Sequence, residues 1–387
     1  MKVCMLAYSF YERDNRVRRY AETLARRGDT VEAIALCRDG QPREELLAGV
    51  HVSRIQHRVV DEGSPLSYLV KLMLFFLRSM WVLTVRHLRE PYDVIHVHSV
   101  PDFEVFAAWL PRLLGARVIL DVHDIVPEFY ASKFKVGESS LVFRALVAME
   151  KLSCAFAHHV IIANHLWYER ITARSVPAEK CTAIINYPDL EIFHDRPRQA
   201  RNDGHFVLCY PGTLNWHQGV DLAVEAVYLL RERLPHLRFE IIGDGRMREE
   251  LRSMIAARSL TDRITLTGLV PMEEVAERMA SVDLGIVPKR AEGFGDEAFS
   301  TKIMEFMAMG VPVVAARTRV DELYFNDSLL EFFASGKAED LAAHIEHLAH
   351  HPDRCAALRA NASAFIEANS WEQKQHLYLD LVGHLCR

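Results

Sequence analysis

Residues 297–314 read EAFSTKIMEFMAMGVPVV, and no other stretch of the chain says more about its fold. The apolar spacing predicts a short helix, and the closing GVPVV predicts that this helix ends at a glycine before a buried strand. Ser300 or Thr301 is suited to cap the helix, which leaves Glu297 on the entering loop and Glu305 inside the helix. The amino end of such a helix presents unpaired backbone N–H groups, which bind anions.

The same alternation of apolar runs and helical segments extends along the chain in both directions. Strands are predicted over residues 2–7, 30–37, 92–98, 117–122, 159–163, 181–185, 206–210, 238–242, 264–267, 284–287 and 311–315. Helices are predicted over residues 16–27, 66–89, 141–157, 220–233, 247–258, 272–280 and 303–309. This alternation predicts an α/β protein with doubly wound, mostly parallel, Rossmann-like sheets.

One polar segment divides the alternation into two halves. Residues 194–204 contain proline, glycine and few apolar side chains, as is typical of a linker. The sequence therefore predicts one domain over 1–193 and a second over 205–369. Because ligands bind beyond the carboxyl ends of parallel strands, we expect a cleft where the two domains face each other.

The composition indicates a folded protein in a reducing compartment. Half of the residues are hydrophobic, a quarter are charged, and the formal net charge of −6 argues against nucleic acid as a partner. Seven dispersed cysteines without a C-x-x-C pair indicate free thiols. The N-terminus lacks a signal-peptide pattern and basic residues interrupt the longest apolar region, 66–88, so we expect a cytoplasmic protein without a transmembrane anchor.

The spacing of Glu297 and Glu305, with seven residues between them, admits two interpretations. Eight residues of helix rise about 12 Å, which is the scale of a nucleotide sugar from ribose to hexose. Carboxylates at that spacing can accept hydrogen bonds from hydroxyl groups at both ends of such a ligand. The alternative is two solvated glutamates on a surface helix, and the spacing alone favours this alternative. Glu292, in an EGFG motif, does not keep the spacing.

Together with the GVPVV exit, the stretch resembles the E-x7-E element of family 4 retaining glycosyltransferases, which have the GT-B fold. The resemblance extends over nearly the whole chain, with matching segments DVIHVHS (93–99), DVHDIVPE (121–128), YPGTLNWHQGVD (210–221), IIGDG (241–245) and LTGLVP (266–271). SWE at 370–372 matches the start of the family's final helix, which crosses back to the first domain and is expected here over 370–387. The resemblance implies two Rossmann-like domains facing a cleft.

The resemblance also implies roles for individual residues. Glu297 would bind the donor hexose and stabilise the transition state, Glu305 would hold the ribose, and His123 would contact the donor sugar beside the acceptor. His123 and Glu297 are thus the candidate catalytic residues. The candidate residues for binding the nucleotide sugar are Gly212, Thr213, Val270, Lys289, Arg290, Phe299, Ser300, Thr301, Lys302 and Glu305.

The chain departs from the family pattern in its glycine loop. Thr213 and Gln218 are neutral where family members often carry an Arg and a Lys. A leaving diphosphate needs charge compensation, and the nearest cations in sequence are Lys302 and the pair Lys289–Arg290, with Arg16 as a further candidate. The departure keeps two alternatives to sugar transfer open. These are a nucleotide-sugar epimerase of the GT-B fold and an inactive subunit that binds sugar nucleotides.

No metal or other cofactor is expected. His96 and His98 alternate onto one strand face, but no carboxylate or cysteine lies at ligand spacing in the sequence, so both are interpreted as packing or cleft-lining groups. Enzymes of this GT-B type need no D-x-D metal site, according to the resemblance. The expected partners are a nucleotide sugar and a glycan or lipid-linked acceptor of cell-surface polysaccharide synthesis, such as exopolysaccharide, O-antigen or capsule.

The segment 66–89 admits two interpretations of its own. Lys71, Arg78, Arg86 and Arg89 fall on one stripe of an otherwise apolar helix that carries no acidic residue. Such a stripe can lie on an anionic membrane, which would place the protein at the inner face of the cytoplasmic membrane. The alternative is a core helix whose cations reach solvent.

Overall fold

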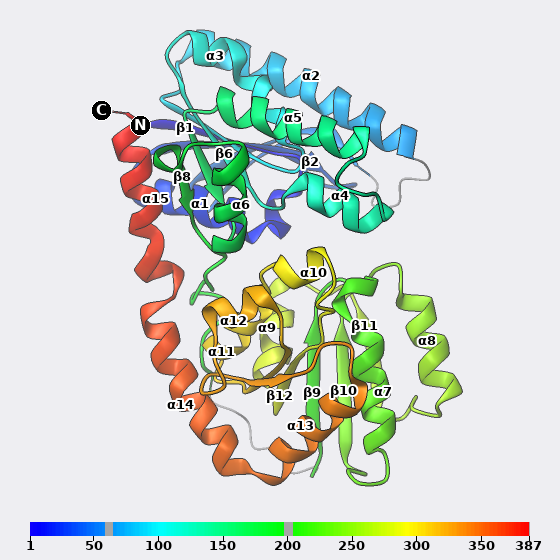
Figure 1. The fold of residues 1–387 in the computed structure, drawn as a ribbon. Coiled ribbons are helices and arrows are strands. Elements are labelled where there is room, and N and C mark those ends of the chain that lie inside the picture. Colours follow the sequence, from blue (N-terminus) through cyan, green and yellow to red (C-terminus); the bar gives the residue numbers. More distant parts are fainter. Residues whose placement is uncertain (59–64, 197–203, 387) are drawn as a thin grey trace. The chain divides into compact units, whose positions relative to one another are not determined.

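The computed structural model describes residues 1–58, 65–196 and 204–386. The chain forms two compact units, unit 1 (Met1–Asn186 with Gln375–Arg387) and unit 2 (Tyr187–Lys374) (Figure 1). The division after Asn186 precedes the expected boundary at 193, because the carbonyl of Pro188 accepts a hydrogen bond from Trp371 and the N–H of Leu190 donates to Glu372. The final helix likewise begins in unit 2 and enters unit 1 after Lys374. Residues 197–203 of the expected linker lie outside the described residues.

Unit 1 is built on an eight-stranded sheet in the order β3-β4-β2-β1-β5-β6-β7-β8. Its strands are β1 (Lys2–Ala7), β2 (Thr30–Cys37), β3 (Glu44–Leu47), β4 (Val50–His57), β5 (Val94–His98), β6 (Arg117–Val122), β7 (His159–Ile162) and β8 (Cys181–Ala183). The pairing is parallel except between β3 and β4. The chain runs outward from β1 first on one side and then on the other, so the order reverses between β1 and β5.

Helices cover both faces of this sheet (Figure 1). They are α1 (Asn15–Arg26), α2 (Pro65–Arg89), η2 (Asp102–Ala108), α3 (Trp109–Leu113), α4 (Val126–Phe134), α5 (Leu141–Phe156), α6 (His165–Arg174) and α15 (Trp371–Leu385), with short turns η1 (Tyr11–Arg13) and η3 (Ala178–Lys180). Three begin with a polar side chain that accepts from the first turn, Asp14 for α1, Ser140 for α5 and Asn164 for α6.

Unit 2 repeats the plan with a six-stranded sheet in the order β11-β10-β9-β12-β13-β14. Its strands, all parallel, are β9 (Phe206–Pro211), β10 (Leu237–Ile242), β11 (Ile264–Gly268), β12 (Leu284–Val287), β13 (Val313–Ala316) and β14 (Glu331–Phe333). The order reverses between β9 and β12. The two sheets confirm the predicted α/β class.

Helices surround this sheet, and α7 packs directly against it. They are η4 (Trp216–Gln218), α7 (Val220–Leu230), α8 (Arg248–Ala257), α9 (Met272–Ala280), α10 (Phe294–Glu297), α11 (Thr301–Ala308), α12 (Arg319–Tyr324), α13 (Ala338–His350) and α14 (Pro352–Ala368). Leu208 and Tyr210 of β9 lie in one fully buried cluster with Val224 and Val227 of α7. This packing fixes β9, and with it the loop that leaves its carboxyl end.

Candidate active site

The candidate site of unit 2 lies where the strand order reverses, at the carboxyl ends of β9 and β12. The loop 212–219 after β9 approaches its neighbours backbone to backbone. A Cβ on Gly243 would lie 1.9 Å from the carbonyl oxygen of Gly212, and one on Gly219 would lie 2.0 Å from that of Pro288. Because only glycine permits such contacts, the glycines hold this loop flush against the ends of β10 and β12.

Helix α11 carries Glu305, one of the two carboxylates predicted to flank a ligand, and α10 carries the other, Glu297. Ser300, one of the two predicted caps, is the N-cap of α11, but its side chain makes no capping hydrogen bond. The first backbone N–H groups are therefore not taken by that hydroxyl. Glu305 is half-buried one turn into the helix. Glu297 ends α10, and its Oε1 lies 3.2 Å from Nη1 of Arg319.

Lys302 connects α11 to the glycine loop. A Cβ on Gly212 would lie 2.5 Å from Cε of Lys302, so the lysine stem rests directly on that glycine. Its ammonium donates to Oε1 of Gln218 at 3.3 Å and lies over the Tyr210 ring, 5.5 Å from the centroid. Burial lowers the pKa of Lys302 to about 8, against the attraction of Glu305. The structure thus places one cation beside the amino end of α11.

The other two predicted cations of unit 2, Lys289 and Arg290, are held by acidic partners. Nζ of Lys289 is buried 2.8 Å from Oδ2 of Asp321 and donates to the carbonyl of Ala298 at 2.7 Å. Arg290 forms two hydrogen bonds with Asp221, at 2.9 and 2.6 Å, and stacks on Trp216. Lys289 therefore fixes the segment entering α11, and Arg290 fixes the glycine loop.

The remaining candidates of unit 2 lie in the loops after β9 and β11 and at the start of α11. The carbonyl of Thr213 accepts the Tyr210 hydroxyl at 2.9 Å. Val270 is half-buried in the loop that follows β11. The Phe299 ring packs edge-on against Tyr324 with centroids 5.0 Å apart. Thr301 is the first residue of α11.

Unit 1 gathers its polar groups around the carboxylate of Asp121, at the end of β6. Arg16 donates to both oxygens at 2.7 Å. Nδ1 of His98 and Nε2 of His123 each lie 3.1 Å from Oδ2. His98 and His123 also line a small pocket of 200 Å³ together with Tyr8, so the predicted catalytic histidine does face a cavity.

The ion pair with Arg16 sets the protonation of this cluster. Burial opposes ionisation of Asp121, but the guanidinium outweighs it and holds the pKa of Asp121 well below its usual range. Burial also lowers the pKa of His98. Since a carboxylate only accepts, His98 donates through Nδ1–H and His123 through Nε2–H. Nδ1 of His123 is then the ring nitrogen that is not directed at Asp121.

The Asp121 cluster also bears on the expectation that no carboxylate accompanies His96 and His98 as a metal ligand. Asp121, which pairs with His98 in the register of β5 and β6, completes a group of three with His96 and His98 whose ligand atoms lie within 4.8 Å of one another. A carboxylate does therefore lie within ligand distance of the two histidines, contrary to the expectation from spacing. Arg16 already neutralises this carboxylate, however, and would repel a metal cation at the same place.

Comparisons with known proteins decide the family. The profile "Glycosyl transferase 4-like domain" matches residues 14–186, and "Glycosyl transferases group 1" matches residues 191–365. Together the two profiles cover most of the chain. The chain is a family 4 glycosyltransferase. Its two doubly wound units are those of the GT-B fold.

Two curated relatives and one solved structure are similar to this glycosyltransferase. The amylovoran biosynthesis glycosyltransferase AmsK of Erwinia amylovora is 29% identical over 46% of this chain and 44% of its own length. The putative glycosyltransferase EpsD of Bacillus subtilis is 24% identical over 74% of this chain and 76% of its own. The Anabaena protein Alr3699/HepE, solved with UDP and glucose, superposes with a TM-score of 0.75 at 18% identity, covering 99% of this chain and all of that one.

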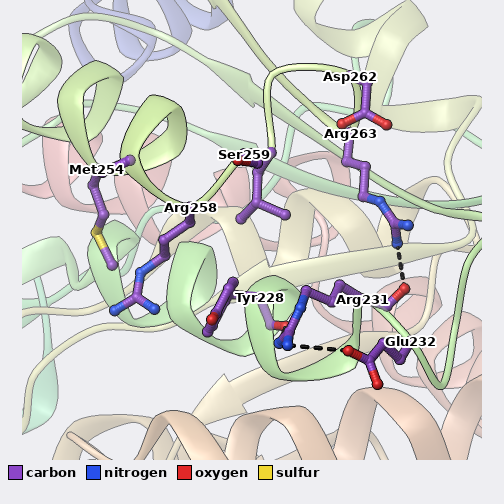
Figure 2. Close-up of a pocket in the computed structure, with 10 residues that line it drawn as sticks. Tyr228, Arg231, Glu232, Met254, Arg258, Ser259, Asp262 and Arg263 are labelled. Atoms are coloured by element: carbon purple, nitrogen blue, oxygen red, sulfur yellow. Dashed lines mark hydrogen bonds and ion pairs between the residues drawn. The ribbon is translucent and has the colours of Figure 1, made fainter.

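A larger pocket of the glycosyltransferase lies elsewhere in unit 2. Its volume is 880 Å³, and Figure 2 shows Arg231, Arg258 and Arg263 around Tyr228. The carbonyl of Arg263 accepts the N–H of Phe239 at the start of β10, so this pocket borders the amino ends of the strands. Arg231 and Arg258 are paired with Glu232 and Glu225. The pocket is therefore separate from the candidate site.

Proposed function

We propose that the enzyme transfers a sugar, with retention of anomeric configuration, from a nucleoside-diphosphate sugar to a hydroxyl group of a lipid-linked glycan. The relative named for amylovoran biosynthesis supports a role in making a cell-surface polysaccharide. The Anabaena structure solved with UDP supports a uridine nucleotide as the first donor to test. We further propose that the enzyme works in the cytoplasm, in peripheral contact with an anionic membrane.

One observation carries the proposal. Lys302 and Glu305, three residues apart, share a face of α11, and Lys302 rests on Gly212 at the reversal of strand order. An ammonium group, a helix amino end and a glycine loop together suit a diphosphate. Glu305 then lies farther along the helix for the ribose. Glu297 lies on the other side of the amino end for the hexose.

The chain's own residues would act mainly by binding and charge compensation. Lys302 and the first N–H groups of α11 would stabilise the negative charge that gathers on the leaving diphosphate. His123 would accept a hydrogen bond from a donor-sugar hydroxyl through Nδ1, because Asp121 takes its Nε2–H. We propose no dedicated protein base. The leaving phosphate would assist removal of the acceptor proton.

Nuclear magnetic resonance of the product tests the reaction type. The enzyme is supplied with an α-linked nucleoside-diphosphate sugar and a glycan acceptor, and the anomeric proton of the product is followed. We expect the product to be α-linked. A β-linked product would contradict retention. A nucleotide sugar whose sugar has been epimerised without transfer would indicate a nucleotide-sugar epimerase.

The affinity for nucleoside diphosphate should depend on pH through Lys302. Its pKa of about 8 means that the free enzyme carries the charge at pH 7 and loses it as the pH rises. The dissociation constant should therefore be flat from pH 6.5 to about 7.5 and then rise toward about tenfold per pH unit. Calorimetric titration between pH 6.5 and 9 measures it. Lys302→Arg, which stays charged, should remove the rise. An identical rise in Lys302→Arg would rule out this lysine.

Transfer should continue after removal of divalent metals. We propose that Lys302 and the helix amino end compensate the diphosphate, and that Arg16 occupies the carboxylate of the His96, His98 and Asp121 group. Initial rates in excess EDTA should stay within about twofold of untreated enzyme, because no proposed step uses a metal. Loss of activity on chelation, recovered with magnesium or manganese, would show a required metal.

A further inference from the structure

Helix α2 exposes apolar side chains along one whole face. The exposed set is Leu69, Val70, Met73, Leu74, Leu77, Trp81 and Leu88, and Trp81 is 70% exposed. At about 100° per residue these residues lie within a sector of roughly 140°. Exposed apolar surface of this extent on a soluble domain marks a contact site. The core-helix interpretation therefore describes only the opposite face, where Leu72, Phe75 and Leu83 are buried.

Two neighbouring helices extend this surface. Helix α5 exposes Leu141, Val142, Met149 and Leu152, and α3 exposes Trp109 and Leu113. Turn η2 lies between α2 and α5, since Phe103 packs on Phe76 and Phe106 packs on Phe156, and α3 contacts α2. Figure 1 shows α2, α3 and α5 on the same face of the unit 1 sheet. We call the exposed apolar residues of these three helices the apolar face.

Cations flank the apolar face along α2 and α5, whereas the exposed glutamates of the described chain next to these helices, Glu90 and Glu138, lie beyond the helix ends. Arg78 and Arg89 of α2 and Arg144 and Lys151 of α5 are exposed beside the apolar sectors. Helix α2 contains no acidic residue. The single acidic residue of α5, Glu150, is buried in an ion pair with Arg174. Arg86, by contrast, pairs with Glu32 and Glu44, so the four-cation stripe is not available as a unit.

We infer that the apolar face inserts into the interface of an anionic lipid bilayer, with the flanking cations at the headgroups. Exposed tryptophans beside cations match the chemistry of a membrane interface. A second copy seated on the same face would bring the flanking cations against each other, which disfavours self-association. This inference rests on the proposed membrane contact and names its surface.

Helix α2 lies on the membrane in this account and does not cross it. By length and composition it is long and apolar enough to span a bilayer, although 22% of its apolar window is buried. If α2 crossed the bilayer, Phe75 would lose its contact with Tyr8, in which the ring centroids are 5.0 Å apart. Leu72 and Leu83, which are buried, would become exposed. The helix thus presents one face to the protein and another to lipid.

Vesicle co-sedimentation tests the inference. The full-length enzyme is mixed with two kinds of phosphatidylcholine vesicle, one without phosphatidylglycerol and one with about 30% phosphatidylglycerol. Each mixture is measured in low and in high salt. We expect binding to the anionic vesicles that weakens in high salt without vanishing. Leu77→Ser with Trp81→Ser should weaken binding at least about tenfold. Arg89→Gln with Lys151→Gln should lose about tenfold on anionic vesicles only.

Matched controls separate this surface from general hydrophobicity and from the proposed reaction. Leu46→Ser, at an exposed leucine on strand β3 of the same unit, should bind vesicles like wild type. All variants should keep the thermal stabilisation by UDP, which reports folding and the unit 2 site independently of lipid. Wild type that stays in the supernatant would overturn the inference. So would full binding by the Leu77/Trp81 variant, or a dimer that this variant dissociates.

Discussion

Glu297→Ala is expected to lower kcat by about 10- to 150-fold while the dissociation constant for the nucleoside diphosphate changes little. The reason is that Glu297 is assigned to the donor hexose and the transition state, and a lost hydrogen bond to a charged group costs about 1.5–3 kcal/mol. Glu305→Ala should instead raise the dissociation constant by a similar factor while kcat changes little, because Glu305 is assigned to the ribose. Steady-state kinetics and calorimetric titration of both variants measure the difference.

Glu292 provides a matched control for this pair. It is an exposed glutamate just before α10, and it does not keep the spacing to Glu305. Glu292→Ala should retain wild-type kcat and affinity within about twofold, as is usual for an exposed surface side chain. Wild-type kcat in Glu297→Ala would refute the catalytic assignment. Equal losses in all three variants would show that the loop and not one carboxylate is required.

Asp121→Ala is expected to lower the free energy of unfolding of unit 1 by about 3–5 kcal/mol. The substitution leaves the guanidinium of Arg16, whose side chain is 4% exposed, without its buried counter-ion. The depressed pKa of Asp121 also fixes the sign of the pH dependence. Its contribution is complete above the unfolded-state pKa of about 3.9 and is lost as the pH falls through the native value.

Urea unfolding at pH 7 and at about pH 2.5, below the unfolded-state pKa, measures both effects. The transition of unit 2 can be identified by its shift with UDP, which leaves the unit 1 transition for comparison. Asp39→Ala is the control, because Asp39 is 95% exposed in the same unit, and it should change stability by less than about 0.5 kcal/mol. A loss in Asp121→Ala no larger than in Asp39→Ala would contradict the account of the buried pair.

Several elements could be predicted to the residue because their sequences carry strong local signals. Strands β1, β2, β6 and β12 and helix α9 begin and end at the predicted residues. These strands are mostly apolar and buried along most of their length, as is typical of parallel sheets, although β2 includes Glu32 and β6 includes Asp121. The edge strand β3 and its neighbour β4 were not predicted. β4 reads VHVSRIQH, in which polar residues are interleaved, and β3 contains two glutamates, so neither resembles a buried run.

Only those parts of the candidate site that lie within one short stretch of the sequence could be predicted. Ser300 at the start of α11 and Glu305 within it follow from one short stretch. The roles of Lys289 and Arg290 do not, because their partners Asp321 and Asp221 are distant and no spacing rule connects them. The pairing of Arg16 with Asp121 joins α1 to β6 across 105 positions in the sequence, and only the folded unit brings these two residues together.

The contact of Arg319 with Glu297 was missed for the same reason. The two residues lie on different helices, α12 and α10, and a surface arginine gives no signal in the sequence. The apolar face was missed for another reason. Exposed and buried leucines are identical in a sequence, so the periodicity of α2 could not show which side faces the sheet.

The central claim is that a nucleoside diphosphate binds at the amino end of α11 through Lys302 and Glu305. The most direct measurement is calorimetric titration of the enzyme with UDP, GDP and ADP, repeated on Lys302→Met and Glu305→Ala, with Glu292→Ala as control. We expect one nucleotide to bind wild type and the control equally, and each site variant at least about tenfold more weakly. Binding of that nucleotide with unchanged affinity to both site variants, or no binding of any of the three to wild type, would contradict the claim.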